Sequence, residues 1–166
     1  MVIIEGADGT GKTTLAKAIV KWTGGQYIHC SYNCDWDIEV YHRHILHFAG
    51  KLEEQAKVPV VIDRWAISED VYGSAYRDGP SYDTAKLHEE AVKAYSPKLI
   101  YCTNDYIVAN HKKLKWARAE MYEDITPACT QYAASMISGK YSPYIRYDFN
   151  RTDITNFIKS QFKESI

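Results

Sequence analysis

One eight-residue segment constrains this chain more than any other: a glycine-rich loop with the pattern G-x-x-x-x-G-K-T at residues 6–13. It follows the apolar run 2–4 and precedes a helix-like stretch. A strand that ends in such a loop turns backbone N–H groups inward, places a helix N-terminus behind them and adds a lysine beside the outer phosphates. The loop therefore predicts binding of a nucleoside triphosphate. The alternative is a β-to-helix turn that matches by chance, and the order of strand, loop and helix counts against it.

Each residue type in the loop has its own chemical use. Gly9 and Gly11 permit backbone geometry that a side chain would obstruct. Lys12 can reach the β- and γ-phosphates, and Thr13 can offer its hydroxyl to Mg²⁺. We therefore expect ATP and Mg²⁺ as cofactors, with Lys12 as a catalytic residue and Thr13 as a metal ligand. The expected ATP-binding residues of the loop and its helix are Gly9, Thr10, Gly11, Lys12, Thr13 and Thr14.

Length and composition set limits on the whole chain. With 166 residues, of which 46% are hydrophobic, residues 1–166 are expected to form one domain with a sizeable core. The formal charge is −1, from 20 Lys and Arg against 21 Asp and Glu, so no global positive field favours a nucleic-acid partner. No stretch approaches the ~20 apolar residues of a membrane span, and no leader pattern precedes the first run. A cytoplasmic protein without a membrane partner is expected.

Short β-rich runs alternate with longer helix-like segments, which is typical of a parallel sheet with helices on both faces. Together with the loop, this pattern predicts an α/β fold of the P-loop NTPase type: a three-layer α/β/α sandwich around a five-stranded parallel sheet, with a short lid. The strands are expected at residues 2–5, 26–30, 58–63, 98–103 and 144–149. The helices are expected at residues 12–22, 36–55, 83–94, 116–137 and 152–162.

A second group of polar residues follows the apolar run 58–62. The run delivers Asp63 and Arg64 to the carboxyl end of a buried-type strand, the side on which open α/β sheets bind ligands. As an isolated dipeptide, this sequence could be an exposed ion pair at a strand end. Beside a triphosphate site, an arginine and a base or Mg²⁺ ligand are needed near the γ-phosphate. We therefore expect Asp63 to be catalytic and a metal ligand.

At this point the chain resembles the thymidylate kinase family of nucleoside monophosphate kinases. Residues 5–14 are similar to that family's E-G-x-D-G-x-G-K-[ST]-T. Residues 63–65 resemble its D-R-[YH], with a tryptophan as an aromatic departure. Ser68 and Tyr72 fall where the family places its S-x-x-A-Y. Arg77 falls five residues beyond Tyr72, where the family has a substrate-contacting arginine.

The resemblance implies a role for each matching residue. Arg64 would bind the phosphate of the acceptor, and a guanidinium fork suits a phosphate monoester. Arg77 would face the nucleotide, Asp8 would approach the sugar 3′-hydroxyl, and Tyr72 would crowd the 2′ position, which favours deoxyribose. Ser68 would belong to the same substrate-binding site. The structural alternatives are a solvated loop position for Arg77 and a packing role for Tyr72.

A basic run at residues 111–120, after the fourth strand, has the position of a lid, expected at about residues 108–122. The loop carries Thr10 where one subgroup of the family has its catalytic arginine. The chain is therefore similar to the other subgroup, whose lid supplies that arginine. Arg118 is the expected catalytic arginine that closes on the phosphates, with Lys115 second. The alternative is a solvated charged face.

Departures from the family leave the base of the acceptor open. The R-E-P-G after the second strand is replaced by residues 29–33, so one phosphate-binding arginine is lost or relocated, with Arg43 as a candidate position. The chain is also shorter than a typical member, mainly in the substrate-facing region and the lid. After the last strand, Arg151 could border the adenine of ATP as an ATP-binding residue, or Asn150 or Thr152 could cap the final helix.

These observations predict an ATP- and Mg²⁺-dependent transferase that binds nucleotide substrates. The first hypothesis is a nucleoside monophosphate kinase that converts a deoxynucleoside monophosphate, dTMP first, to the diphosphate; alignment and charge neutralisation would supply most of the rate. The second is a kinase of a hydroxyl acceptor, either a deoxynucleoside kinase or a kinase of a modified base or DNA end, with Asp63 as the general base. The third is a non-catalytic nucleotide-binding switch. Family members are often dimers, so a homodimer is possible.

Overall fold

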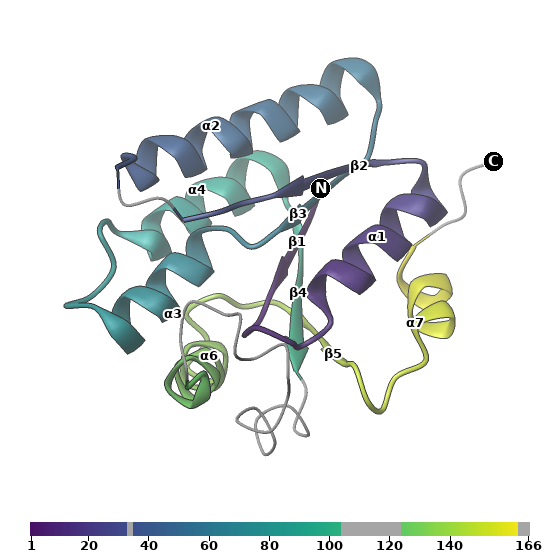
Figure 1. Ribbon diagram of the computed structural model, residues 1–166. Coiled ribbons are helices and arrows are strands. Elements are labelled where there is room, and N and C mark those ends of the chain that lie inside the picture. The colour runs from purple at the N-terminus through teal and green to yellow at the C-terminus, as the bar shows by residue number, and fades with distance from the viewer. Residues whose placement is uncertain (33–34, 104–123, 163–166) are drawn as a thin grey trace.

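A parallel β-sheet forms the centre of the molecule (Figure 1). The computed structural model describes residues 1–32, 35–103 and 124–162. Within these residues the sheet has five strands in the order β2-β3-β1-β4-β5. From β1 the chain goes to the edge strand β2, returns to β3 beside β1, and then crosses to β4 and β5 on the other side, as in other doubly wound sheets. The strands are β1 (Val2–Glu5), β2 (Gln26–His29), β3 (Val60–Asp63), β4 (Lys98–Thr103) and β5 (Ile145–Asp148).

β1 and β3 form the buried middle of the sheet. All four residues of each are buried, as expected for continuous apolar runs that helices cover on both faces. In the register of the sheet, Ile4 and His29 both lie opposite Asp63. Glu5, Asp63 and His29 therefore end three neighbouring strands at the same edge of the sheet.

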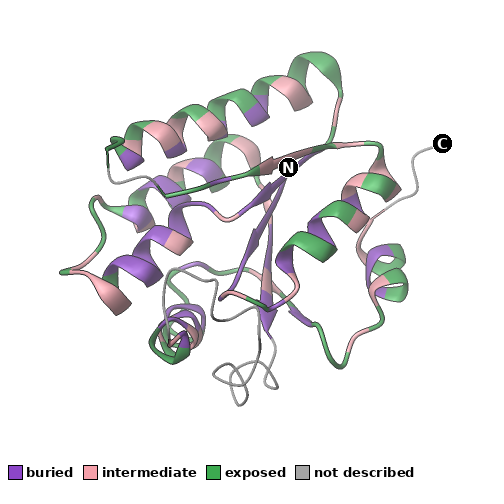
Figure 2. Ribbon diagram, viewed as in Figure 1, coloured by how far each residue is buried: buried purple, intermediate pink, exposed green. Residues whose placement is uncertain are grey.

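Helices cover both faces, which confirms the predicted three-layer arrangement. One face packs on α1 (Lys12–Thr23) and α7 (Ile154–Gln161) through a core that includes Ile4. The other face packs on four helices through a core that includes Ile3. Buried residues concentrate in the sheet and on the helix sides that face it (Figure 2). The four helices of the second face are α2 (Ile38–Lys51), α3 (Ala66–Tyr76), α4 (Thr84–Tyr95) and α6 (Thr126–Ile137).

Most predicted elements are found with boundaries moved by a few residues. The five strands and the helices at 12–22, 83–94 and 152–162 are confirmed. The helix expected at 36–55 ends in a π-helical turn, Leu52–Ala56. In the described part of the chain, the helix expected at 116–137 begins only at Thr126, where a proline occupies the first turn. No helix among the described residues is both long and apolar enough to cross a bilayer.

Helix α3, which forms one side of the candidate site, was not predicted from the sequence. Glu69, Asp70, Val71 and other positions around this helix are buried, so its sequence lacks the polar stripe of a surface helix. No side chain of its own N-cap caps the helix. Instead, the Glu5 carboxylate accepts hydrogen bonds from the backbone N–H groups of Trp65 and Ser68. A cap that comes from another strand leaves no local sequence signal.

Candidate active site

The glycine-rich loop joins β1 to α1 and leaves the helix N-terminus accessible to an anion. Gly9 and Gly11 have φ angles of 75° and 83°, in the left-handed region that disfavours side chains. A Cβ on Gly11 would lie 2.2 Å from the Phe149 ring. Gly11 is the N-cap of α1 and makes no side-chain cap. The first N–H groups of the helix therefore have no side-chain cap from Gly11, which suits the phosphate site that the sequence predicts.

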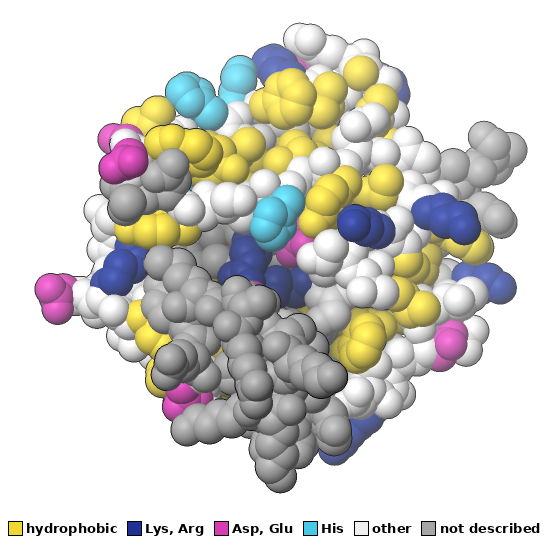
Figure 3. Space-filling model, in the orientation of Figure 1, with side chains coloured by type: hydrophobic (Ala, Val, Ile, Leu, Met, Phe, Trp, Pro, Cys, Tyr) yellow, Lys and Arg dark blue, Asp and Glu magenta, His cyan; other side chains and the backbone are white. Residues whose placement is uncertain are grey.

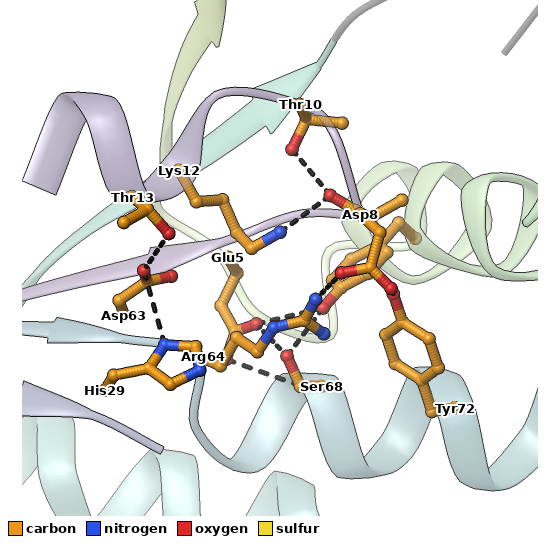
Figure 4. Close-up of polar contacts among 12 residues, drawn as sticks. Glu5, Asp8, Thr10, Lys12, Thr13, His29, Asp63, Arg64, Ser68 and Tyr72 are labelled. Carbon is orange, nitrogen blue, oxygen red and sulfur yellow. Dashed lines mark hydrogen bonds and ion pairs between the residues drawn. The ribbon is translucent and has the colours of Figure 1, made fainter. Parts of the chain in front are cut away.

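Lys12 and Thr10 both bond to the backbone of this loop (Figure 4). Lys12 Nζ donates to the Ala7 carbonyl at 2.6 Å, and Thr10 Oγ1 donates to the same oxygen at 2.8 Å. A phosphate oxygen would offer Nζ a charged acceptor, and charge-assisted hydrogen bonds are roughly twice as strong as neutral ones. The loop thus holds the lysine at the place where phosphates are expected.

Asp63, at the end of β3, joins the loop to the edge strand. Its Oδ2 accepts hydrogen bonds from Thr13 Oγ1 at 2.7 Å and from the Tyr27 hydroxyl at 2.8 Å. The same oxygen lies 3.4 Å from His29 Nδ1. Burial and the Asp63 carboxylate raise the pKa of Tyr27 to about 12, so this hydroxyl remains a donor.

The second oxygen of Asp63 supports the predicted metal site. Oδ1 is buried and has no hydrogen-bond partner in the described part of the protein. Leaving such an oxygen unmatched costs free energy. Among the described residues, no group of three or more His, Cys, Asp and Glu could hold a metal ion by itself. Thr13 and Asp63 fit Mg²⁺, which usually takes one or two protein ligands and completes its shell with water and phosphates.

Arg64 leaves the same strand end in a strained conformation. Its φ is 68°, a left-handed value that is uncommon for a side-chain-bearing residue, and its N–H donates to the Ile4 carbonyl at 2.9 Å. The guanidinium forms an ion pair with Asp8 of the loop and lies 5.2 Å from the centre of the Tyr72 ring. The Tyr72 hydroxyl donates to Asp8 Oδ2 at 3.0 Å. Such strain, which persists only under strong tertiary constraint, is a mark of functional sites.

Glu5 is a buried carboxylate that the sequence analysis did not select. Its Oε2 accepts hydrogen bonds from Ser68 Oγ at 2.6 Å and from the Tyr132 hydroxyl at 3.0 Å, and its Oε1 accepts from the Trp65 N–H at 2.7 Å. Burial raises the pKa of Glu5, and these bonds together with nearby Arg64 act against the rise. Glu5 therefore fixes the start of α3, and an acidic residue that ends a buried strand was its sequence signal.

A cavity of about 360 Å³ lies beside the loop. All the residues predicted to bind the acceptor line it, so the structure brings them together. Basic side chains lie in the hollow at the centre of the face in Figure 3, with a histidine close to them. The lining includes His29, His42 and Glu69, which the sequence analysis did not select. The predicted residues in the lining are Asp8, Arg64, Ser68, Tyr72 and Arg77.

Other predicted residues lie away from this cavity. Arg43 is half-exposed and paired with Glu39 and Glu90 on the surface, so its proposed position as a relocated phosphate-binding arginine is wrong. Its partners are charged neighbours on α2 and α4. The cavity lining instead has His29, the first residue of the segment that replaces the missing motif.

The two remaining candidate arginines are Arg118 and Arg151. Arg118 and the lid at about residues 108–122 lie outside the described residues. Arg151 follows β5, is 75% exposed and lies 3.7 Å from Asp148. The final helix is capped by Asp153, whose side chain accepts a hydrogen bond from a backbone N–H, so neither of the two predicted caps is correct.

Comparison by sequence gives no relatives: no protein-family model and no curated protein matches the chain. Solved structures do match. YorR from Bacillus subtilis, in complex with phosphorylated GDP, is 23% identical with a TM-score of 0.67, over 96% of this chain and 91% of YorR. Deoxyadenosine kinase from M. mycoides with bound dATP is 17% identical with a TM-score of 0.55, over 96% and 95% of the two chains.

A thymidylate kinase has the same architecture. The enzyme from Ehrlichia chaffeensis is 12% identical with a TM-score of 0.51, and the match covers 96% of this chain and 94% of the enzyme. At such identities the likeness concerns the backbone and not the substrate. The chain therefore has the fold of the P-loop nucleotide kinases.

Proposed function

We propose that the protein transfers the γ-phosphoryl group of ATP, with Mg²⁺, to a deoxynucleoside monophosphate, with dTMP to dTDP as the first reaction to test. The observation that carries the proposal is the position of Arg64. Its guanidinium lies in a cavity beside the glycine-rich loop, and its ionic partner Asp8 belongs to that loop. A phosphate held by Arg64 would therefore face the terminal phosphate of a nucleotide held by the loop.

The side chains divide into donor and acceptor groups. Lys12 would stabilise charge on the moving phosphoryl group, and the α1 N-terminus would bind the phosphates. Bound Mg²⁺, held by Thr13 and Asp63, would neutralise charge on the β- and γ-phosphates. The acceptor phosphate would replace Asp8 at Arg64. Asp8 would then be available to the sugar 3′-hydroxyl, next to Tyr72.

A phosphate acceptor needs little help from a base. One of its oxygens forms the new bond to the γ-phosphorus while the bond to the β–γ bridging oxygen breaks, and ADP leaves. The cavity would contribute alignment, and Arg118 in the proposed lid would add positive charge, with Lys115 as the alternative. The nucleotides named with the structural neighbours, phosphorylated GDP and dATP, support a nucleotide substrate for this chain.

A second candidate function rests on the contact between Asp63 and His29. His29 lines the acceptor cavity and its Nδ1 faces the Asp63 carboxylate at 3.4 Å. A carboxylate that orients an imidazole is the arrangement by which many enzymes activate a hydroxyl. This contact favours a hydroxyl acceptor, which includes a deoxynucleoside, a modified base or a DNA end. In that reaction the histidine would take the hydroxyl proton, in place of Asp63.

Transfer of label from γ-labelled ATP distinguishes these functions. The acceptors are dTMP, thymidine and a single-stranded oligonucleotide, each tested with and without Mg²⁺. We expect labelled dTDP that depends on Mg²⁺. If label appears only in thymidine monophosphate made from thymidine, or only in the oligonucleotide, the protein phosphorylates a hydroxyl and the second function is the correct one. ATP binding without a labelled product from any acceptor would indicate a nucleotide-binding switch.

A further inference from the structure

The acceptor cavity has a second polar end, away from the glycine-rich loop, where α2 faces α3. His42 comes from α2, and Glu69 and Arg77 come from α3 and its C-terminal cap. All three line the cavity. Since Arg64 and Asp8 occupy the end beside the loop, a nucleotide whose phosphate lies there would place its base against His42 and Arg77.

Arg77 is held by fixed neighbours. Its guanidinium donates to Glu69 Oε2 at 2.7 Å and lies 4.7 Å from the centre of the Tyr32 ring. The other Glu69 oxygen accepts hydrogen bonds from the Ser81 N–H and hydroxyl, each at 2.9 Å. Both oxygens of this buried carboxylate are thus already used by the protein. A guanidinium has five N–H donors and no acceptor, so Arg77 can only donate to a base.

His42 is a buried, neutral histidine whose Nδ1 contacts a tyrosine hydroxyl. Burial lowers the pKa of His42 to about 4, against a smaller opposing effect of Glu69, so the ring carries one proton at neutral pH. Its Nδ1 lies 2.6 Å from the Tyr82 hydroxyl. Among the described residues, this hydroxyl and this ring are each other's one hydrogen-bond partner. When the tyrosine hydroxyl donates to Nδ1, the imidazole proton lies on Nε2.

The ring also has a fixed orientation. The Trp65 indole N–H donates to the His42 backbone carbonyl at 3.0 Å, which fastens α2 to the start of α3. Tyr82, on the Nδ1 side, does not line the cavity, whereas His42 does. The Nε2 side consequently faces the cavity, and with Tyr82 donating to Nδ1 it presents an N–H donor there.

We propose that His42, with Arg77, forms a donor-only base site that selects keto bases, thymine or guanine, over the amino bases cytosine and adenine. The distal edge of thymine or guanine carries a keto oxygen, which accepts a hydrogen bond. The same position in cytosine or adenine carries an amino group, which would face an N–H donor without an acceptor. This inference rests on the proposed function for the nucleotide's placement. It holds equally for a monophosphate or a hydroxyl acceptor.

The experiment compares kcat/KM for dTMP, dGMP, dCMP and dAMP, or for the four deoxynucleosides if only hydroxyls are phosphorylated. We expect the better keto base to exceed both amino bases by at least about tenfold, since base discrimination by hydrogen bonds is worth about 1–3 kcal/mol. If no acceptor is phosphorylated, the proposed function fails, and the same comparison is made by calorimetric binding of the four nucleotides.

Two variants test the role of the tautomer. His42→Gln places an amide near the Nε2 position that can rotate to donate or accept, and it should reduce the keto-to-amino ratio to about threefold or less. Tyr82→Phe keeps the aromatic ring, removes the hydroxyl that fixes the tautomer, and should lower the ratio by a smaller factor. The matched control is His88→Gln, because His88 is also buried but does not line the cavity. The control should leave the ratio unchanged.

The tautomer itself is measured by ¹⁵N NMR of the His42 ring, which does not require turnover. We expect the Nε2–H form in the native protein and a mixture of tautomers in Tyr82→Phe. Three results would each overturn the proposal. They are an amino base as the best acceptor, an Nδ1–H tautomer in the native protein, and an equal fall of the keto-to-amino ratio in His42→Gln and His88→Gln. If Tyr82→Phe does not fold, the native spectrum and His42→Gln still decide it.

Discussion

The two ends of the acceptor cavity are built in different ways. At the loop end, charged groups hold one another: Asp8 pairs with Arg64, and Lys12 bonds to a loop carbonyl. A ligand phosphate can replace each of these partners. At the far end, His42 contacts the Tyr82 hydroxyl and Arg77 pairs with Glu69, whose two oxygens already accept hydrogen bonds from the protein. In the proposed function, this difference separates transfer, at the loop end, from recognition of the base, at the far end.

The largest expected effect is at the loop end. Lys12→Ala should lower kcat by about 10³-fold, because it removes a preorganised charge from the transferring phosphoryl group. The keto-to-amino ratio should not change, since the far end is intact. Lys17→Ala, an exposed position on the same helix, is the control and should keep full activity. A Lys12→Ala protein with activity within tenfold of native would contradict the assignment of the loop.

The far end can be tested through stability and pH. The pKa of His42 is about 4 in the folded protein against 6.5 in the unfolded chain, so the unfolded chain binds the extra proton first as pH falls. The contribution of neutral His42 to the free energy of unfolding is complete above pH 6.5. It is lost between pH 6.5 and about 4, a loss of about 3 kcal/mol. Urea unfolding of the native protein and of His42→Gln at several pH values measures this loss as the difference between the two curves of stability against pH. Parallel curves for the two proteins would show that His42 is not a buried neutral group.

A third experiment separates the two ends directly. Arg64→Lys should raise the KM of the acceptor by about 30-fold, because an ammonium cannot make the paired hydrogen bonds of a guanidinium to a phosphate. The KM of ATP and the keto-to-amino ratio should remain within about twofold of native, because both depend on other residues. Arg43→Lys, on the surface, serves as the control. Equal increases of both KM values would place Arg64 in the donor site instead.

The smallest expected effect connects the two ends through α3. Glu5→Gln should lower the free energy of unfolding by about 1–2 kcal/mol, since the amide cannot accept all the hydrogen bonds of the buried carboxylate. Because α3 carries residues of both ends, acceptor KM should rise and base preference should fall together. The control is Glu89→Gln, which removes an exposed ion pair with Lys93. It should change the free energy of unfolding by less than about 0.5 kcal/mol. Unchanged base preference in a destabilised Glu5→Gln protein would show that the ends are independent.

The loop end could be predicted from the sequence because its residues are neighbours in the chain. Gly9, Gly11, Lys12 and Thr13 lie within one turn and one helix start, and Asp63 follows an apolar run that is recognisable as a buried strand. Short-range spacing therefore predicts their placement. The structure adds the orphaned Asp63 oxygen, which depends on burial and has no sequence pattern.

The far end could not be predicted in the same way. His42 and Tyr82 are 40 residues apart, and the proton position of the histidine depends on their contact. The helix between the two ends, α3, was missed because it is buried and its cap comes from Glu5 on another strand. The catalytic arginine expected in the lid, Arg118, stays a prediction because it lies outside the described residues.

The central claim is that the glycine-rich loop and the Arg64 cavity hold the two substrates of one transfer reaction. A bisubstrate ligand, adenosine and thymidine joined through their 5′ positions by five phosphates, tests it by calorimetry without turnover. The account predicts that it binds at least about 100-fold more tightly than ATP, because linked ligands gain effective concentration. Lys12→Ala and Arg64→Lys should each weaken it. An affinity equal to that of ATP and insensitive to Arg64→Lys would contradict the claim.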